Sequence, residues 1–234
     1  QCGLLDGTEP LMPMVMHKDR KVRYRVTDLL STYPERVPPK VGEALLLALH
    51  KQADATDRTP LRVLGAYHSE AGRALVREQL LSEDAKVRGQ VSFILYGWLE
   101  DAPIMSMVSD ALKNEKNNRV IRSWSAPLSR SPLPEAQEGI VYILQTQKGR
   151  MAELAISSIS KQSWDGIIPE LRRVLLQIAE TRTADADGRK ALQALCNWRV
   201  QEAVPLVLHL HEQGPDDLKR DLTNWTRNWP DALQ

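Results

Sequence analysis

Aromatic residues, cysteines and long apolar runs are all scarce in this chain of 234 residues, which contains one Phe and two Cys. A core built on Phe is therefore excluded, and the many Leu, Ala and Val residues favour thin helices packed in layers over a wide β core. Two cysteines are too few for a disulfide framework. No stretch approaches the roughly 18 consecutive apolar residues that span a bilayer. We expect an all-helical protein without a membrane span.

An excess of one charge is also missing. The 31 basic and 30 acidic side chains leave a formal net charge of +1. No overall field then draws the molecule toward nucleic acid or an anionic membrane, so any such attraction would have to be local. The hydrophobic content of 42% is enough for a substantial core. These figures predict a folded, soluble protein.

The two cysteines bear on reactivity and location. Cys196 lies in the apolar run ALQALC, which favours a small buried thiol over a reactive one. Cys2 follows Gln1 at the start of a chain without an initiator Met. This start is compatible with a processed exported or lipid-anchored precursor, with a piece of something longer, and equally with a cytoplasmic protein.

A short phrase recurs along the chain. DRKVR occupies positions 19 to 23, and DAKVR occupies positions 84 to 88. The repeat is followed through five copies that place an acidic or amide residue four positions before an Arg, namely Asp19 with Arg23, Asp54 with Arg58, Asp84 with Arg88, Asn118 with Arg122, and Asp185 with Arg189. Degenerate copies near Arg150 and near Lys219 and Arg220 complete a series with a period of about 33 residues.

Apolar residues follow these arginines at fixed offsets. Val91, Ile94 and Leu95 stand three, six and seven positions after Arg88, and the same offsets recur after Arg23 and Arg189. Such offsets fall on one stripe of a helix. A second helical run, such as GRALVREQLL, precedes each copy, and a polar turn separates the two runs. Each unit is therefore predicted to be a pair of helices. We expect its Asp to cap the second helix and its Arg to reach the neighbouring unit.

A helix, a turn with Asp, and the letters VR at the start of a second helix resemble the HEAT-repeat family and its bacterial HEAT-like relatives. DRKVR and DAKVR match the family's D-x-x-V-R phrase, whereas other copies replace the Val with Asp57, Ile121 or Gly188, and Thr146 stands in place of the acid before Arg150. The resemblance implies an all-α, armadillo-like fold, a right-handed α-solenoid of about seven HEAT-like helical hairpins. It implies one domain over 1–234, with approximate units 11–37, 38–69, 70–101, 102–134, 135–164, 165–201 and 202–234.

Stacked repeats create extended surfaces without needing a catalytic pocket. We therefore expect a non-catalytic protein–protein interaction scaffold or adaptor that binds another protein on its concave face, without a cofactor or metal. HEAT-like iron hydroxylases use several His-Glu pairs as ligands, but here only His211 with Glu212 matches. His209 and His211 point to opposite faces of a helix, which makes a poor chelate.

A nucleic-acid function is the alternative, because HEAT-like DNA glycosylases are similar in length and fold and use a basic concave face carrying Trp and Asp. Trp198 in CNWRV, and Trp225 and Trp229 in NWTRNWP, resemble a stacking surface. We favour the interpretation that they close the open end of the stack, because the terminal layer of a solenoid needs a cover. The alternative is therefore a HEAT-like nucleic-acid binder or DNA glycosylase-type enzyme. The net charge of +1 argues against a strong phosphate-binding groove.

Two basic clusters are the candidate partner-binding residues. The first comprises Arg20, Lys21 and Arg25 in HKDRKVRYR, which form either a solvated face or a site for an acidic partner. The second comprises Arg119, Arg122 and Arg130 around Trp124. In this fourth unit Ser125 and Ser129 break the expected apolar offsets. A binding surface and a local bend of the solenoid both explain the broken pattern.

Overall fold

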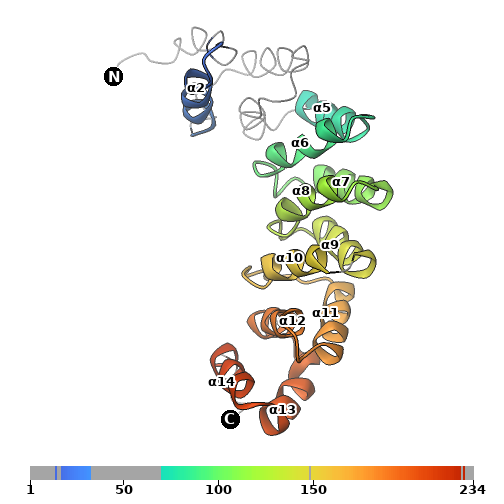
Figure 1. Ribbon diagram of the computed structural model, residues 1–234, viewed down its shortest axis with the longest axis vertical. Helices are drawn as coiled ribbons and strands as arrows, with labels where there is room; N and C mark the ends of the chain where they lie inside the picture. The colour runs from blue at the N-terminus through green and yellow to red at the C-terminus, as the bar shows by residue number, and fades with distance from the viewer. Residues whose placement is uncertain (1–13, 15–16, 33–69, 148, 228, 230–234) are drawn as a thin grey trace. The chain divides into compact units, whose positions relative to one another are not determined.

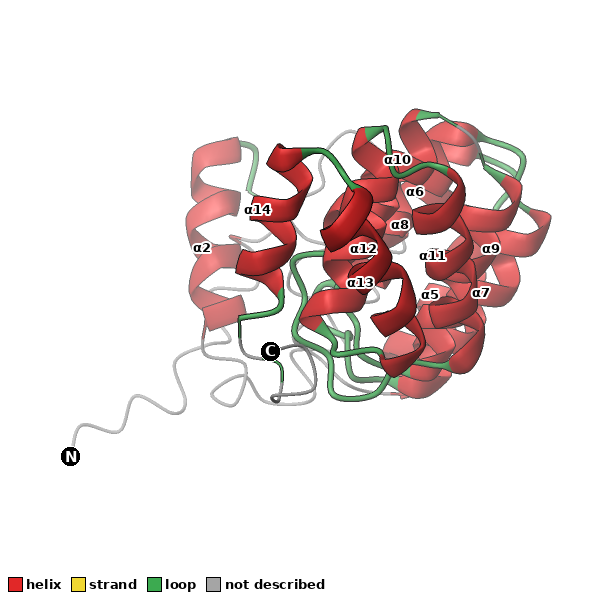
Figure 2. Ribbon diagram, turned by 90° about the horizontal axis from the view of Figure 1, so that it is seen from below, coloured by secondary structure: helices red, strands yellow, loops and turns green. Residues whose placement is uncertain are grey.

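Helices are the only extended regular structure in the part of the chain that the structure describes. The structure is a computed structural model that describes residues 14, 17–32, 70–147, 149–227 and 229. These residues form eleven α-helices and one short 3-10 helix, with no strand among them (Figures 1 and 2). The all-helical prediction is thus confirmed for the described ranges. No helix within them combines the length and apolar character needed to cross a bilayer.

The chain divides into two compact units, residues 1–127 and 128–234. The first unit contains α2 (Arg20–Thr32), α5 (Glu70–Leu80), α6 (Ala85–Leu95), α7 (Ala102–Asn114) and all but the last residue of α8 (Asn118–Leu128). The second contains α9 (Pro134–Thr146), α10 (Arg150–Ile159), α11 (Pro169–Thr181), α12 (Ala186–Asn197), η3 (Gln201–Ala203), α13 (Val204–Gln213) and α14 (Asp216–Trp225). The predicted copy at Asp54 and Arg58 lies outside the described residues.

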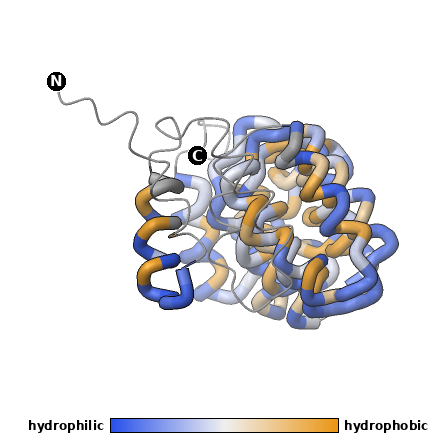
Figure 3. The backbone as a smooth tube through the Cα atoms, turned by 90° about the horizontal axis from the view of Figure 1, so that it is seen from above, coloured by the Kyte–Doolittle hydropathy of each residue, from blue (hydrophilic) through white to orange (hydrophobic). Residues whose placement is uncertain are grey.

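Helices of the first unit pack as successive pairs. Helix α5 packs against α6, its partner across the turn, and against α7 of the next pair. Helix α8 contacts α6 through Trp124, whose indole N–H donates to the backbone carbonyl of Arg88 at 2.9 Å. On α6, Val91, Ile94 and Leu95 are each at most 1% exposed, which places the predicted apolar stripe in the core. Hydrophobic and hydrophilic positions alternate along the helices in the same way (Figure 3).

Helices of the second unit form two layers. The first helices α9 and α11 pack side by side, and the second helices follow one another as α10, α12 and α14. Contacts between α11 and α12, and between α13 and α14, join the two layers (Figure 1). Apolar side chains are thus buried both within a pair and between adjacent pairs, although α13 buries only Val207.

Side-chain caps and prolines fix where the helices begin. The carboxylates of Asp84, Asp101 and Asp185 accept backbone N–H groups from the first turns of α6, α7 and α12. A proline stands in the first turn of α7, α9, α11 and α13, where its missing N–H breaks no helical bond. Sequence signals of this kind place the helix starts independently of tertiary contacts.

A buried amide joins the pairs of the second unit. Gln137 of α9 is 0% exposed, and its Nε2 donates to the carbonyls of Pro132 and Gly166 at 2.8 and 2.7 Å. Its Oε1 accepts the N–H of Ile168, which precedes α11, at 2.9 Å. Because every polar atom of this amide is satisfied, the contact fixes the register of α9 against the start of α11.

Gln137→Ala should destabilise the protein by about 3 kcal/mol, because it leaves buried backbone groups without partners and opens a cavity. Gln145→Ala is the matched control on the same helix. The Gln145 amide also contacts the next pair, donating to Glu170 at 3.0 Å, but it is exposed. Urea unfolding of both variants measures the difference. Equal losses in the two would show that the buried contact has no special role.

Candidate partner-binding surface

The repeated phrase has the same local structure in both copies. The carboxylate of Asp19 accepts the N–H of Lys21 at 2.8 Å, and that of Asp84 accepts the N–H of Lys86 at 2.8 Å. The arginine that ends each phrase turns back to the preceding turn. Arg23 donates to the carbonyls of residues 17 and 18 at 2.6 and 3.0 Å, and Arg88 to those of residues 82 and 83 at 2.7 and 2.9 Å. In both copies the phrase thus caps the helix that follows and ties its first turn to the preceding turn.

Arg88 also reaches the next pair of helices. Its Nε and Nη2 donate to the two carboxylate oxygens of Glu115 at 2.6 and 3.0 Å, in a bidentate pair. The Glu115 side chain is 3% exposed and also accepts the N–H groups of Lys116 and Asn117. Burial by itself would raise the pKa of Glu115, but Arg88 and these N–H groups together hold that pKa below its usual value. The carboxylate therefore stays charged inside the turn.

A similar link occurs in the second unit. Arg189 of α12 donates to Asp217, in the first turn of α14, at 2.5 Å. Lys219 of α14 turns back to the preceding turn and donates to the carbonyl of Glu212 at 2.9 Å. The departure at Gly188 from the D-x-x-V-R pattern also has a steric reason. A Cβ at this position would lie 1.9 Å from the carbonyl oxygen of Arg182.

The copy assigned to Asn118 and Arg122 is wrong by one residue. Asn117 caps α8, since its Oδ1 accepts the N–H of Arg119 at 2.9 Å. The N–H of Ile121 donates to the carbonyl of Asn117, as that of Arg88 does to Asp84. Ile121 therefore occupies the position of Arg88 and is 2% exposed. Spacing alone could not separate two adjacent asparagines, because the capping residue is decided by the first helical N–H groups.

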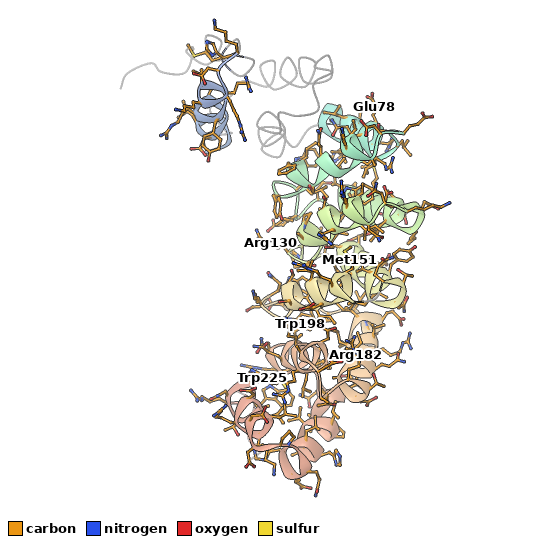
Figure 4. All side chains as sticks on the ribbon, in the orientation of Figure 1. Glu78, Arg130, Met151, Arg182, Trp198 and Trp225 are labelled. Atoms are coloured by element: carbon orange, nitrogen blue, oxygen red, sulfur yellow. The ribbon has the colours of Figure 1, made fainter. Side chains whose placement is uncertain are left out.

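Arg122 lies on the surface of α8. Arg119 and Arg122 stand one turn apart on α8, and both are exposed. Within the described part of the chain, neither guanidinium makes a hydrogen bond or an ion pair. Arg130, labelled in Figure 4, is exposed as well but belongs to the other compact unit. Two of the three predicted arginines are thus neighbours on one helix.

Trp124 does not belong to the predicted binding surface. Its side chain is 0% exposed, and its indole N–H is used by the carbonyl of Arg88. Ser125 and Ser129 are also buried, at 4% and 0% exposure. The broken apolar pattern therefore reflects small polar residues inside the core. The Ser125 hydroxyl donates a hydrogen bond within α8, to the carbonyl of Arg122 at 3.1 Å.

The first predicted cluster lies on α2. Arg20, Lys21 and Arg25 are all exposed, and none of their side chains makes a hydrogen bond or ion pair to a described residue. Lys21 and Arg25 are four residues apart and share a helix face. Tyr24, which is 48% exposed, separates them from Arg20 around the helix.

Trp198 and Trp229 pack between helix pairs, whereas Trp225 is half-buried at the end of α14. Trp198, which lies beside α12 (Figure 4), donates its indole N–H to the carbonyl of Gln162 at 2.9 Å, and Trp229 donates to that of Cys196 at 2.8 Å. Both contacts repeat the bond of Trp124, each reaching a residue about one repeat earlier in the chain. Trp198 also stacks on Trp164 with ring centroids 5.3 Å apart. Sequence reasoning missed these contacts, because no regular spacing of the tryptophans signals them.

Other reactive groups are few among the described residues. No group of three or more His, Cys, Asp or Glu side chains that could hold a metal ion occurs there. Burial raises the pKa of the Cys196 thiol to about 12, so the buried, unreactive reading of this cysteine holds. His211 contacts the hydroxyl of Thr223 at 3.3 Å on the surface.

Open grooves lie on the described helices of the first unit, and two of them contain charged residues. One of about 450 Å³ lies between α5 and α7 and is lined by Arg73, Arg77 and Met107 among others. Arg73 is already paired with Asp101 at 2.8 Å. The other, of about 360 Å³, lies beside the turns and has Leu81 in its lining, a side chain that is 76% exposed. Its charged lining includes the Arg88 and Glu115 pair, which is already satisfied.

Comparison with known proteins leaves the family open. No family model matches the chain, and no curated protein matches it. One matching solved structure, described as a crystal structure of an engineered protein, is 15% identical over 95% of this chain and 98% of that chain, with a TM-score of 0.32. A TM-score this low carries no argument about the fold.

Arg199 adopts a backbone conformation that favours glycine. Its φ is 54°, and it ends α12 in a Schellman arrangement, with its own N–H bonded to the carbonyl of Cys196 and that of Val200 to Leu195. A Cβ in this conformation costs about 1–2 kcal/mol. The exposed Arg199 side chain has no hydrogen bond or ion pair among the described residues to offset that cost.

Glu115→Gln should destabilise the protein by about 1–3 kcal/mol at neutral pH, because it removes the charge from a buried, bidentate pair. Because the pKa of Glu115 in the folded protein is below its ordinary value of 4.5, the ion pair with Arg88 contributes its full stability above pH 4.5. That stability is lost as the pH falls through the lowered pKa of the folded state. The gap between wild type and variant should therefore close in acid. Asp110→Asn, at the exposed pair with Lys113, should change stability little at any pH. Urea midpoints from neutral to acidic pH test this, and a gap independent of pH would contradict it.

Arg199→Gly should stabilise the protein by about 0.5–1 kcal/mol, since relief of the strained conformation outweighs the extra freedom of glycine in the unfolded chain. Arg199→Ala is the control because it keeps the Cβ, and it should give no such gain. Thermal unfolding measures both. A gain of equal size in the two variants would assign the effect to the lost charge.

Proposed function

We propose that the protein is a non-catalytic scaffold or adaptor that binds another protein along its layer of second helices. The same proposal includes a right-handed HEAT-like solenoid of about seven hairpins, with 11–37, 38–69 and the five later units as its repeats. Support comes from the packing of each helix pair mainly on its neighbours, in α5 with α7 and in α10, α12 and α14. An architecture of that kind offers a long surface assembled from successive second helices.

The observation that carries the proposal is a separation of charge between the two layers formed by α5, α6, α7 and α8 of the first unit. The second helices α6 and α8 contain Lys86, Arg88, Arg119 and Arg122 and no acidic residue. The first helices α5 and α7 contain three basic and three acidic residues, namely Arg73, Arg77, Lys113, Glu70, Glu78 and Asp110. A surface that is uniform in sign on one layer only is typical of a recognition face.

A nucleic-acid ligand is the second candidate, because the same unpaired cations attract phosphate. This reading predicts binding that weakens steeply as salt rises. It applies to a simple nucleic-acid binder and to an enzyme of the glycosylase type alike.

Site-specific photocrosslinking tests the scaffold. Lys86→benzoylphenylalanine places the crosslinker on α6 of the second layer, and Asp110→benzoylphenylalanine places it on α7 of the first; both positions are exposed. Irradiation in extract from the native cells should give a discrete protein adduct from position 86 and much less from position 110. Equal adducts from both positions, or none from position 86, would contradict the proposed face.

A further inference from the structure

We propose that the face formed by α6 and α8 recognises an acidic segment of polypeptide that also carries an apolar side chain. This inference rests on the proposed scaffold function and adds the chemistry of its partner. The face comprises Lys86, Gln90 and Phe93 of α6, Tyr96 directly after α6, and Arg119, Arg122 and Ala126 of α8.

The two helices meet at a seam of small residues. A Cβ added to Gly89 of α6 would lie 3.9 Å from both the hydroxyl of Ser123 and a methyl group of Val120 on α8. Gly89 and Ser123 thus face each other across the seam, and the Trp124 indole bonded to Arg88 holds the helices together beneath it. Because neither seam residue projects a long side chain, a bound segment can approach the helices closely.

The basic side chains beside the seam are accessible to a ligand. Lys86, Arg119 and Arg122 are exposed, and their side chains make no hydrogen bond or ion pair among the described residues. Arg119 and Arg122 are one turn apart, so their guanidinium groups can engage carboxylates on the same side of a bound segment. No carboxylate of α6 or α8 competes with such a ligand.

The face also has an aromatic part. Tyr96 is 41% exposed and Phe93 is half-buried, and both lie toward the end of α6, away from Lys86. Apolar contact of this kind adds to the affinity without depending on salt. The combination suits a peptide with carboxylates on one part and an apolar side chain on another.

An acidic peptide fits this face better than nucleic acid does. Strong, steeply salt-dependent binding to nucleic acid is the behaviour of a protein that makes about six to ten phosphate contacts, whereas α6 and α8 offer three unpaired cations. The net charge of +1 adds no wider positive field.

Fluorescence anisotropy with the full chain tests the inference. The probe is a short labelled peptide of glutamates around one central Trp, and its glutamine counterpart and a single-stranded DNA of equal length are the comparison ligands. Arg119→Glu with Arg122→Glu should weaken binding of the glutamate peptide roughly tenfold or more at low salt. Arg119→Lys with Arg122→Lys should retain most of it. Arg77→Glu is the matched control, since Arg77 is an exposed arginine of the first layer, without a hydrogen bond or ion pair among the described residues.

The outcomes separate the two proposals. The inference is supported if the protein binds the glutamate peptide but not the glutamine peptide. This binding should be lost in the Arg119→Glu, Arg122→Glu variant and kept in Arg77→Glu, with unchanged helicity by circular dichroism. Preferential binding of the DNA overturns it in favour of a nucleic-acid ligand. Absence of peptide binding, together with a protein adduct from position 86, overturns the acidic chemistry and leaves the scaffold standing. Absence of both removes the scaffold as well.

Discussion

Burial of apolar stripes between neighbouring helix pairs is the interaction on which this structure depends. Each fully buried Leu, Ile or Val contributes about 1.5–3 kcal/mol, whereas an exposed ion pair contributes about 0–1 kcal/mol. Ile94, Leu95, Leu112 and Ile140 are at most 1% exposed. Apolar burial therefore supplies most of the stability between helix pairs, and the ion pairs between them fix how the pairs are aligned.

Polar links of three kinds fix that alignment. One is the arginine that starts a second helix and reaches the next pair, as Arg88 does with Glu115. Another is the indole N–H that donates to a carbonyl about one repeat earlier, as in Trp124 and Trp198. A third is the buried amide of Gln137. Because each link joins adjacent pairs, a local contact is reused along the chain, and this reuse leaves the outer faces of the helices free to vary in charge.

Charge variation distinguishes the faces of the first unit. The chain as a whole is nearly neutral, yet all the charged residues of α6 and α8 are basic. Where helices are paired, consecutive helices lie in opposite layers. A chain with a balanced net charge can therefore have a surface on which all the charged residues of one layer have the same sign. The proposed binding face is a consequence of this sorting.

The sequence by itself determined the helices and their pairing, because caps, prolines and apolar offsets act within a few residues of one another. It also predicted that Asp84 and Asp185 cap helices and that Arg88 and Arg189 reach the next pair, and it placed Arg119 and Arg122 together on one helix. Only the tertiary structure decided which residue caps α8, that Ile121 stands in the place of an arginine, and that Trp124 is buried while Arg122 is exposed. The cap is a local contact, but two adjacent asparagines offer the same pattern, so only the geometry of the first helical turn distinguishes them. The burial of Trp124 depends instead on its contact with Arg88, 36 residues earlier, and a local pattern carries no information about which side chain a neighbouring helix will cover.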